Sequence, residues 1–174
     1  MNKLVKLLHL KGLQRRFTLY RVNHFLAGTK DGKFEKKRRL LNRLEGFEIG
    51  EGTRIVGPLE TYGTLKTGKN CWIGKNLKIN GNGVVVIGDN CDIAPEVTFQ
   101  TGGHEIGSAD HRAGKGLTFT QTVGSGTWIG GRTTIINNVR IGTGCVVAGC
   151  SCVVKDVPDN SLVAGVPAKR VRSL

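Results

Sequence analysis

A polar segment over Thr101–Thr120 contains the two histidines, His104 and His111, whose chemistry could serve catalysis. Imidazole titrates near neutrality, so a histidine can remove the proton of a hydroxyl group that attacks an electrophile. A polar segment of this length inside a compact domain is usually a functional loop. His104 lies where the strand before the loop should end, and we expect it to be the general base. His111 is expected at the loop surface, with a contact to the substrate as the alternative.

A base histidine also needs a group that holds its second ring nitrogen, commonly a carboxylate or a carbonyl. Asp92 and Glu105 are the two candidate carboxylates. Consecutive residues of a strand point to opposite faces, which disfavours direct pairing between Glu105 and its neighbour His104. The residues alone leave the orienting group open.

An aliphatic or aromatic residue recurs at every sixth position on both sides of this segment. A helix does not explain a period of six with glycine in most units, and neither does a simple two-residue alternation. Short strands joined by tight corners do explain it, with the recurring residue inward and glycine at the corners. The residues in phase are Ile87, Ile93, Phe99, Val123, Ile129, Ile135, Ile141, Val147 and Val153.

Three such hexads make one coil of about 18 residues, and stacked coils bury a continuous apolar column. The predicted fold class is therefore an all-β solenoid. Phe99 and Val123 are 24 residues apart, or four hexads, so the segment between them keeps the phase and should protrude as a loop over residues 101–120. An earlier set is displaced by two residues at Asn80–Gly83, which we interpret as a corner insertion. Its members are Ile49, Ile55, Ile73 and Ile79.

The beginning of the chain differs from the rest in composition. Residues 1–44 contain 13 Lys or Arg and 2 Asp or Glu, a net charge of +11, and 3 of the 26 glycines precede residue 46. We divide the chain into a basic helical segment, 1–46, and a repeat domain, 47–174. Helices that cap the open end of the solenoid are the main interpretation of residues 1–44. Contact with an anionic membrane is the second, and nucleic acid is not expected because no recognition motif is present.

The remaining composition narrows the class of protein. No apolar run exceeds four residues, so we expect neither a transmembrane helix nor a signal peptide. The expected location is the cytoplasm, with peripheral membrane attachment as a variant. The length of 174 residues suits one domain. The five cysteines include no CxxC pair and are expected to be reduced thiols.

Two stretches of the repeat, Ile129–Thr134 and Ile141–Val146, resemble the hexapeptide-repeat acyltransferases. The ending from Val153 to Lys169 is similar to that of the maltose, galactoside and capsule-sugar O-acetyltransferases, and the resemblance covers roughly residues 48–172. It implies a left-handed parallel β-helix, a homotrimer, and acetyl-CoA as co-substrate with no metal. The implied reaction is O-acetylation of a sugar, in surface polysaccharide or glycolipid biosynthesis.

The same resemblance assigns roles to the acceptor side of the site. A histidine after a small pair, as in Thr101-Gly102-Gly103-His104, is the general base of the family, and an acid commonly follows it, which favours Glu105. Trp128 is implied to pack on coenzyme A or on the acceptor. Trp72 and Asn76 fall near positions that shape the acceptor pocket, although the family's asparagine is not clearly matched here.

Coenzyme A is implied to lie in a groove between subunits, held by backbone amides of successive coils and by basic residues near the end of the chain. The matching residues are Gly131, Gly149, Val154, Lys155, Lys169 and Arg172.

Other functions remain as alternatives. The acceptor could be serine, a xenobiotic or an amino sugar, and the solenoid could be a scaffold without catalysis. A carbonic anhydrase of the γ type, which uses the same coil, needs three histidines on a metal. Only His104 and His111 lie beyond residue 46, which argues against that enzyme.

Overall fold

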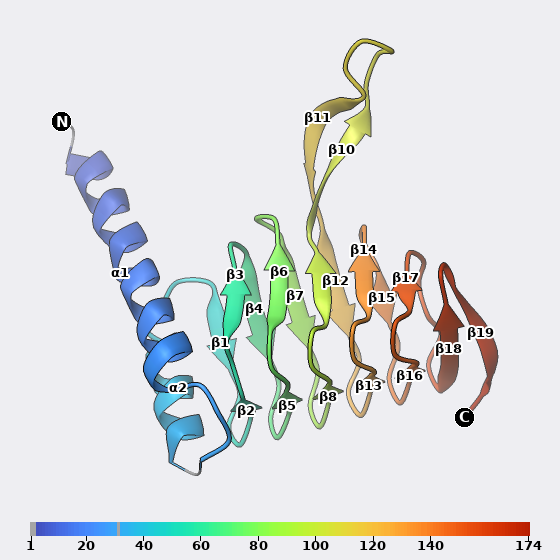
Figure 1. The fold of residues 1–174 in the computed structure, drawn as a ribbon, viewed down its shortest axis with the longest axis horizontal. Helices are drawn as coiled ribbons and strands as arrows, with labels where there is room; N and C mark the ends of the chain where they lie inside the picture. The colour runs from blue at the N-terminus through green and yellow to red at the C-terminus, as the bar shows by residue number, and fades with distance from the viewer. Residues whose placement is uncertain (1–2, 31) are drawn as a thin grey trace.

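The protein is a left-handed parallel β-helix with two helices at its N-terminal end, as seen in a computed structural model that describes residues 3–30 and 32–174, with side chains from residue 10 onward. Figure 1 shows the coils stacked along one axis, with the helices at one end and the C-terminus at the other. The helices are α1 (Lys3–Phe25) and α2 (Lys33–Leu41). A left-handed path departs from the usual right-handed crossover between parallel strands. The sequence prediction of this solenoid is confirmed.

Each coil contributes one strand to each of three sheets, so the solenoid is a three-sided prism. The first sheet contains β1 (Phe47–Ile49), β4 (Thr64–Thr67), β7 (Val84–Ile87), β12 (Thr120–Val123) and β15 (Arg140–Ile141). The second contains β2 (Arg54–Ile55), β5 (Trp72–Ile73), β8 (Asp92–Ile93), β13 (Trp128–Ile129), β16 (Val146–Val147), β18 (Ser161–Gly165) and β19 (Ala168–Ser173). The third contains β3 (Leu59–Thr61), β6 (Leu77–Asn80), β9 (Thr98–Gln100), β14 (Thr134–Ile136) and β17 (Cys152–Val153).

The hexad residues form the apolar column inside this prism, as their spacing predicts. Phe99 and Ile129 are completely buried, and the others in phase are exposed by 3% or less. The register between neighbouring coils explains the six-residue spacing. Phe47 of β1 pairs with Leu65 of β4, which lies eighteen residues, or three hexads, further along the chain. The pairing of Thr64 with Val84 is two residues longer, which confirms the corner insertion at Asn80–Gly83.

The helices close the open end of the column, which confirms the capping interpretation. The Asn23 side chain on α1 donates to the Leu59 carbonyl and accepts from the Leu59 amide, both at 2.8 Å. Asn42, directly after α2, makes the same paired contact with the Ile49 backbone at 2.9 and 2.7 Å. Lys37 of α2 is completely buried and donates to two carbonyls, those of Gly28 and Val56. Among the described residues, neither helix is long and apolar enough to cross a membrane.

The predicted loop over residues 101–120 is a two-stranded antiparallel hairpin, made of β10 (Gly102–Ile106) and β11 (Ala113–Thr118). It leaves the prism at the corner between the third and the first sheet and rises well beyond it (Figure 1). The five cysteines are free thiols, and Cys71, Cys91 and Cys145 are buried in the column.

Candidate functional site

Thr101 fixes the base of the hairpin to the solenoid. It is completely buried, and its hydroxyl donates to the Asn80 carbonyl at 3.1 Å and accepts from the Gly83 amide at 3.2 Å. Its carbonyl accepts from the amide of Phe119 at 2.8 Å, which closes the hairpin at its origin. Residues that flank this point therefore leave the prism in a defined direction.

His104 lies within hairpin strand β10, opposite Gly116 of β11. The sequence prediction that His104 ends the preceding strand is wrong. Strand β9 ends at Gln100, and the next segment, β10, pairs with β11 to form the hairpin. The pairing shifts by one residue between His104 and Ile106, because β11 contains one extra residue there, a β-bulge. His104 is exposed, and Ile106 is 89% exposed. His111 lies in the turn between the two strands, at the exposed tip.

A backbone carbonyl orients the His104 ring. Its Nδ1 lies 2.9 Å from the Gly114 carbonyl oxygen, so Nδ1 carries a proton in this contact and Nε2 is left as the acceptor. Among the described residues, neither Glu105 nor Asp92 makes this contact, which corrects the carboxylate prediction. Asp92 is on β8 of the second sheet, across the prism from the hairpin.

Trp72, Asp92 and Trp128 form one row across the second sheet, each paired with the next. That sheet is the side of the prism opposite the corner that carries the hairpin, and its strands line the lower edge of Figure 1. Within one subunit both tryptophans therefore lie away from His104. The predicted contacts of Trp128 with coenzyme A or the acceptor, and of Trp72 with the acceptor pocket, stay predictions. Trp72 packs edge-on against Phe34 of α2 with ring centroids 5.9 Å apart, and Trp128 is 55% exposed.

Four of the residues predicted to bind coenzyme A border the third sheet. Gly131 and Gly149 stack one coil apart at its corner with the second sheet, where a Cβ on Gly149 would lie 3.1 Å from the Gly131 carbonyl oxygen. Among the described residues, no acceptor is found for either glycine amide, so both N–H groups can donate to a ligand. Val154 and Lys155 follow β17 at the other corner, on the edge that also carries the hairpin.

The other two predicted cofactor residues, Lys169 and Arg172, are on the last strand, β19, which runs antiparallel to β18. Both side chains are exposed. Arg172 donates to the neighbouring Ser173 carbonyl at 3.1 Å, and within the described structure neither residue pairs with a carboxylate. Both cations remain able to bind phosphate.

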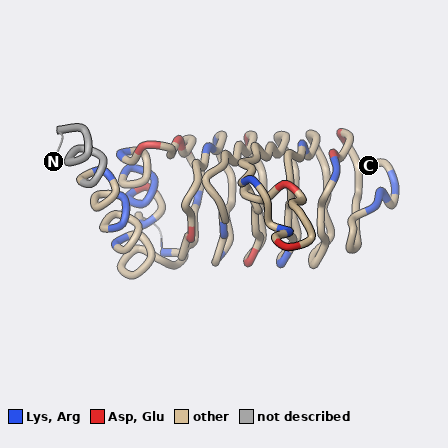
Figure 2. Tube along the Cα trace, turned by 90° about the horizontal axis from the view of Figure 1, so that it is seen from above, with Lys and Arg blue, Asp and Glu red and all other residues tan. Residues whose placement is uncertain are grey.

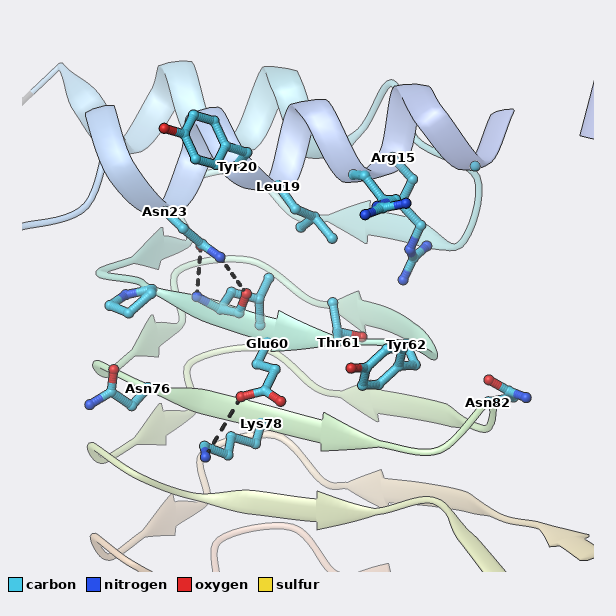
Figure 3. A pocket seen from close by; sticks show the side chains of 14 residues that line it. Arg15, Leu19, Tyr20, Asn23, Glu60, Thr61, Tyr62, Asn76, Lys78 and Asn82 are labelled. Atoms are coloured by element: carbon cyan, nitrogen blue, oxygen red, sulfur yellow. Dashed lines mark hydrogen bonds and ion pairs between the residues drawn. The ribbon is translucent and has the colours of Figure 1, made fainter. Parts of the chain in front are cut away.

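A groove of about 850 Å³ lies between α1 and the outer face of β3 and β6, at the helical end of the third sheet (Figure 3). Asn76, one of the predicted acceptor residues, lines it at the end nearest the corner before β6. Lys78 pairs with Glu60 at 3.6 Å across its floor. The remaining polar lining was not predicted from the sequence and comes from Arg15, Arg16, Tyr20, Asn23, Thr61, Tyr62 and Asn82.

Arg15 joins this groove to the rest of the helical cap. Its guanidinium donates to the carbonyls of Gly63 at 2.6 Å and Glu45 at 3.2 Å, and it lies 4.9 Å from the Phe47 ring. Burial lowers the pKa of Arg15. The polar lining of this groove could not be predicted from the sequence, because it forms only when α1 packs on the third sheet. The described residues contain no cluster of three His, Cys, Asp or Glu that could hold a metal ion.

The chain resembles known acetyltransferases over nearly its whole length, although no family model matches it. Galactoside O-acetyltransferase of Escherichia coli (strain K12) is 32% identical over 166 residues, covering 94% of this chain and 79% of that protein. A hexapeptide-repeat acetyltransferase of Vibrio cholerae, solved with acetyl-CoA, matches with a TM-score of 0.80 and 27% identity, covering 95% of this chain and 88% of that one.

A galactoside acetyltransferase solved in complex with coenzyme A matches with a TM-score of 0.79 and 30% identity, covering 95% of this chain and 82% of that one. Both sequence and fold are thus shared with acetyltransferases over nearly the whole chain. The chain belongs to the hexapeptide-repeat acetyltransferase family that includes galactoside O-acetyltransferase, and it is an acetyltransferase that uses acetyl-CoA.

Proposed function

We propose that the enzyme transfers the acetyl group of acetyl-CoA to a hydroxyl of a sugar, with His104 as the general base. The observation that carries this proposal is the contact between His104 Nδ1 and the Gly114 carbonyl, which leaves Nε2 as a proton acceptor. Nε2 removes the hydroxyl proton as the oxygen attacks the thioester carbonyl carbon. A C–O bond forms, the C–S bond breaks, and the imidazolium returns the proton to the departing thiolate.

The groove between α1 and the third sheet is the proposed acceptor site. Its amide and hydroxyl groups, from Asn23, Asn76, Asn82, Tyr20 and Tyr62, match the hydrogen-bonding groups of a sugar. Aromatic and polar groups together are typical of pockets that fix a small ligand. The acceptor is in our proposal a sugar unit of a surface polysaccharide or glycolipid.

A homotrimer is the proposed assembly, because one subunit does not complete the site. His104 is exposed on a hairpin whose strands, among those described, pair only with each other. The Ile106 side chain near it is 89% exposed, which favours contact with a second surface. In a cyclic trimer, each hairpin reaches the third sheet of a neighbour, so the base and the acceptor groove come from different subunits.

Coenzyme A is proposed to lie along the third sheet between two subunits. The free amides of Gly131 and Gly149 suit its pantetheine carbonyls, and Val154 and Lys155 border the opposite edge. Lys169 and Arg172 are proposed to bind its phosphates by charge-assisted hydrogen bonds. Glu105, Asp92, His111, Trp72 and Trp128 have no role in this proposal within one subunit.

The acceptor class is tested by release of free thiol from acetyl-CoA with matched pairs of acceptors. Each sugar is measured beside analogues that lack one hydroxyl, and serine, a hydroxylated xenobiotic and an amino sugar are measured in parallel. We expect turnover with a sugar that disappears when one particular hydroxyl is absent. Turnover confined to serine, the xenobiotic or the amine of the amino sugar would overturn the sugar hydroxyl proposal, while leaving acetyl-CoA as the donor.

A further inference from the structure

Helix α1 has a second apolar face that the capping contacts do not use. Leu19, Val22 and Leu26 face the solenoid and are buried or half-buried. On the other side, four large apolar residues recur at i, i+3, i+7 and i+10, the spacing of one helical face. These residues, the apolar stripe, are Leu10, Leu13, Phe17 and Tyr20, exposed by 61%, 58%, 62% and 52%. Capping the column does not account for them.

Four cationic side chains, the cation row, lie beside this apolar stripe. Arg21 follows Tyr20 on α1, and Lys36, Arg39 and Arg43 recur at i, i+3 and i+7 along and just beyond α2. With Leu40 they line a shallow groove of about 280 Å³ between the two helices. Among the described side chains, the only carboxylate within ion-pair distance of this cation row is Glu35, 3.9 Å from Arg39.

The charge of the whole segment has the same sign. Residues 1–44 hold 13 Lys or Arg against 2 Asp or Glu. Figure 2 shows the basic residues gathered over the helices, whereas basic and acidic residues alternate along the solenoid. A concentrated positive field beside an apolar face is the pattern of helices that lie in the interface of an anionic membrane.

We propose that the apolar stripe and the cation row together bind the surface of an anionic lipid bilayer. The stripe enters the boundary between headgroups and acyl chains, and the cation row contacts lipid phosphates. A second copy of the chain is a poorer occupant, because an isologous contact would bring two segments of net charge +11 together. Nucleic acid would use the cations but would leave the four apolar side chains exposed. Tyr20 also lines the acceptor groove, and no other residue of the proposed active site takes part in this proposal.

The experiment is sedimentation of the full chain with vesicles of phosphatidylcholine alone and with about 30% phosphatidylglycerol added as the anionic lipid. We expect binding to the anionic vesicles, weakened by salt, and little binding to the neutral ones. The triple variant Lys36→Gln, Arg39→Gln, Arg43→Gln should lower the partition coefficient about 100-fold, since each cation at an anionic surface contributes about fivefold.

Two further variants keep this test specific. The matched control Lys69→Gln, Lys115→Gln, Arg170→Gln removes three exposed cations of the repeat domain, and it should lose only a few-fold in binding. The double variant Leu13→Gln, Phe17→Gln keeps the charge and should weaken binding to the anionic vesicles, with thiol-release activity on a soluble acceptor unchanged.

Three outcomes would overturn the proposal. The first is absence of binding to the anionic vesicles at millimolar lipid. The second is an equal loss of vesicle binding in the cation-row variant and in the matched control. Binding would then depend on the net charge of the chain and not on the position of these cations. The third is a lower molar mass of the Leu13→Gln, Phe17→Gln variant by light scattering, which would show that another copy of the chain covers the stripe.

Discussion

His104 Nδ1 and the carbonyl oxygen of Gly114, 2.9 Å apart across the two hairpin strands, define the orientation of the imidazole. The contact joins a side chain on β10 to the backbone of β11, so the hairpin itself holds the proposed base. A carbonyl in this role fixes the tautomer without adding a negative charge near the thioester. This differs from the carboxylate that commonly performs the same task.

The proposed division of the site between subunits predicts complementation in trans. Gly12 lines the proposed acceptor groove and a Cβ there meets no atom within 4 Å, so we expect the side chain of Gly12→Trp to occupy the groove. Gly12→Trp and His104→Ala should each be inactive alone. Co-expressed in equal amounts, they should recover about a quarter of the wild-type activity, because random mixing leaves that share of interfaces with both an intact base and an intact groove.

Separately purified trimers of the two variants, mixed without subunit exchange, are the control and should remain inactive. Failure of the co-expressed pair to recover activity, with mixed trimers shown by two affinity tags, would mean that the base and the groove act within one subunit.

Lys169→Ala and Arg172→Ala should each raise the KM for acetyl-CoA about tenfold or more, because a charge-assisted hydrogen bond contributes about 1.5–3 kcal/mol. The phosphates are far from the reacting thioester, so the kcat and the KM for the sugar should change little. Arg170→Ala on the same strand is the matched control, since Arg170 donates to Ser173 Oγ at 2.7 Å.

An acetyl-pantetheine thioester, which has no phosphates, distinguishes binding from folding in these variants. It should be used equally well by the wild type, Lys169→Ala and Arg172→Ala. A loss with this short donor as large as the loss with acetyl-CoA would assign both residues to the stability of β19.

Lys37 predicts an unusual dependence of stability on pH. Burial, with a smaller contribution from Lys33, lowers the pKa of Lys37 to about 8. The unfolded chain then binds more protons than the folded one between about pH 8 and 10.5, so the free energy of unfolding rises with pH in this window, by up to about 3 kcal/mol.

Lys37→Met should remove this rise and should not lower the Tm at pH 7, because a buried ammonium without a carboxylate is replaced by an apolar chain of similar length. The Val56 carbonyl still accepts from the Gly28 amide at 2.9 Å in that variant. Calorimetry of both proteins from pH 7 to 10.5 measures the difference. Parallel Tm curves for the two proteins would contradict this assignment.

The sequence was sufficient to predict the column and the protrusion, because inward positions recur every six residues on each side of the two-residue insertion at Asn80–Gly83. Ile87, Phe99 and Val123 keep the phase since the hairpin adds eighteen residues, one full coil, between Val84 and its ladder partner Thr120. The positions of the tryptophans could also have been predicted. Three hexads complete one turn, so counting hexads from the hairpin places Trp128 on the opposite sheet.

Two features of the candidate site could not be predicted from the sequence. The Gly114 carbonyl becomes a partner of His104 only through the register of the hairpin. A bulge in β11, where Gly114 and Lys115 lie opposite Glu105, shifts that register by one residue. The acceptor groove requires α1 to lie against β3, which depends on contacts such as Asn23 with Leu59, 36 residues apart. Non-local packing of this kind is not encoded in a local repeat.

The most direct test of the account is the kcat of His104→Asn at saturating acetyl-CoA and acceptor. Asparagine keeps an N–H donor for the Gly114 carbonyl but has no group that accepts a proton, so the hairpin is retained and the base is lost. The assignment of His104 as the general base predicts that kcat falls about 100- to 10,000-fold with unchanged binding of acetyl-CoA. A His104→Asn enzyme with the wild-type kcat would contradict it.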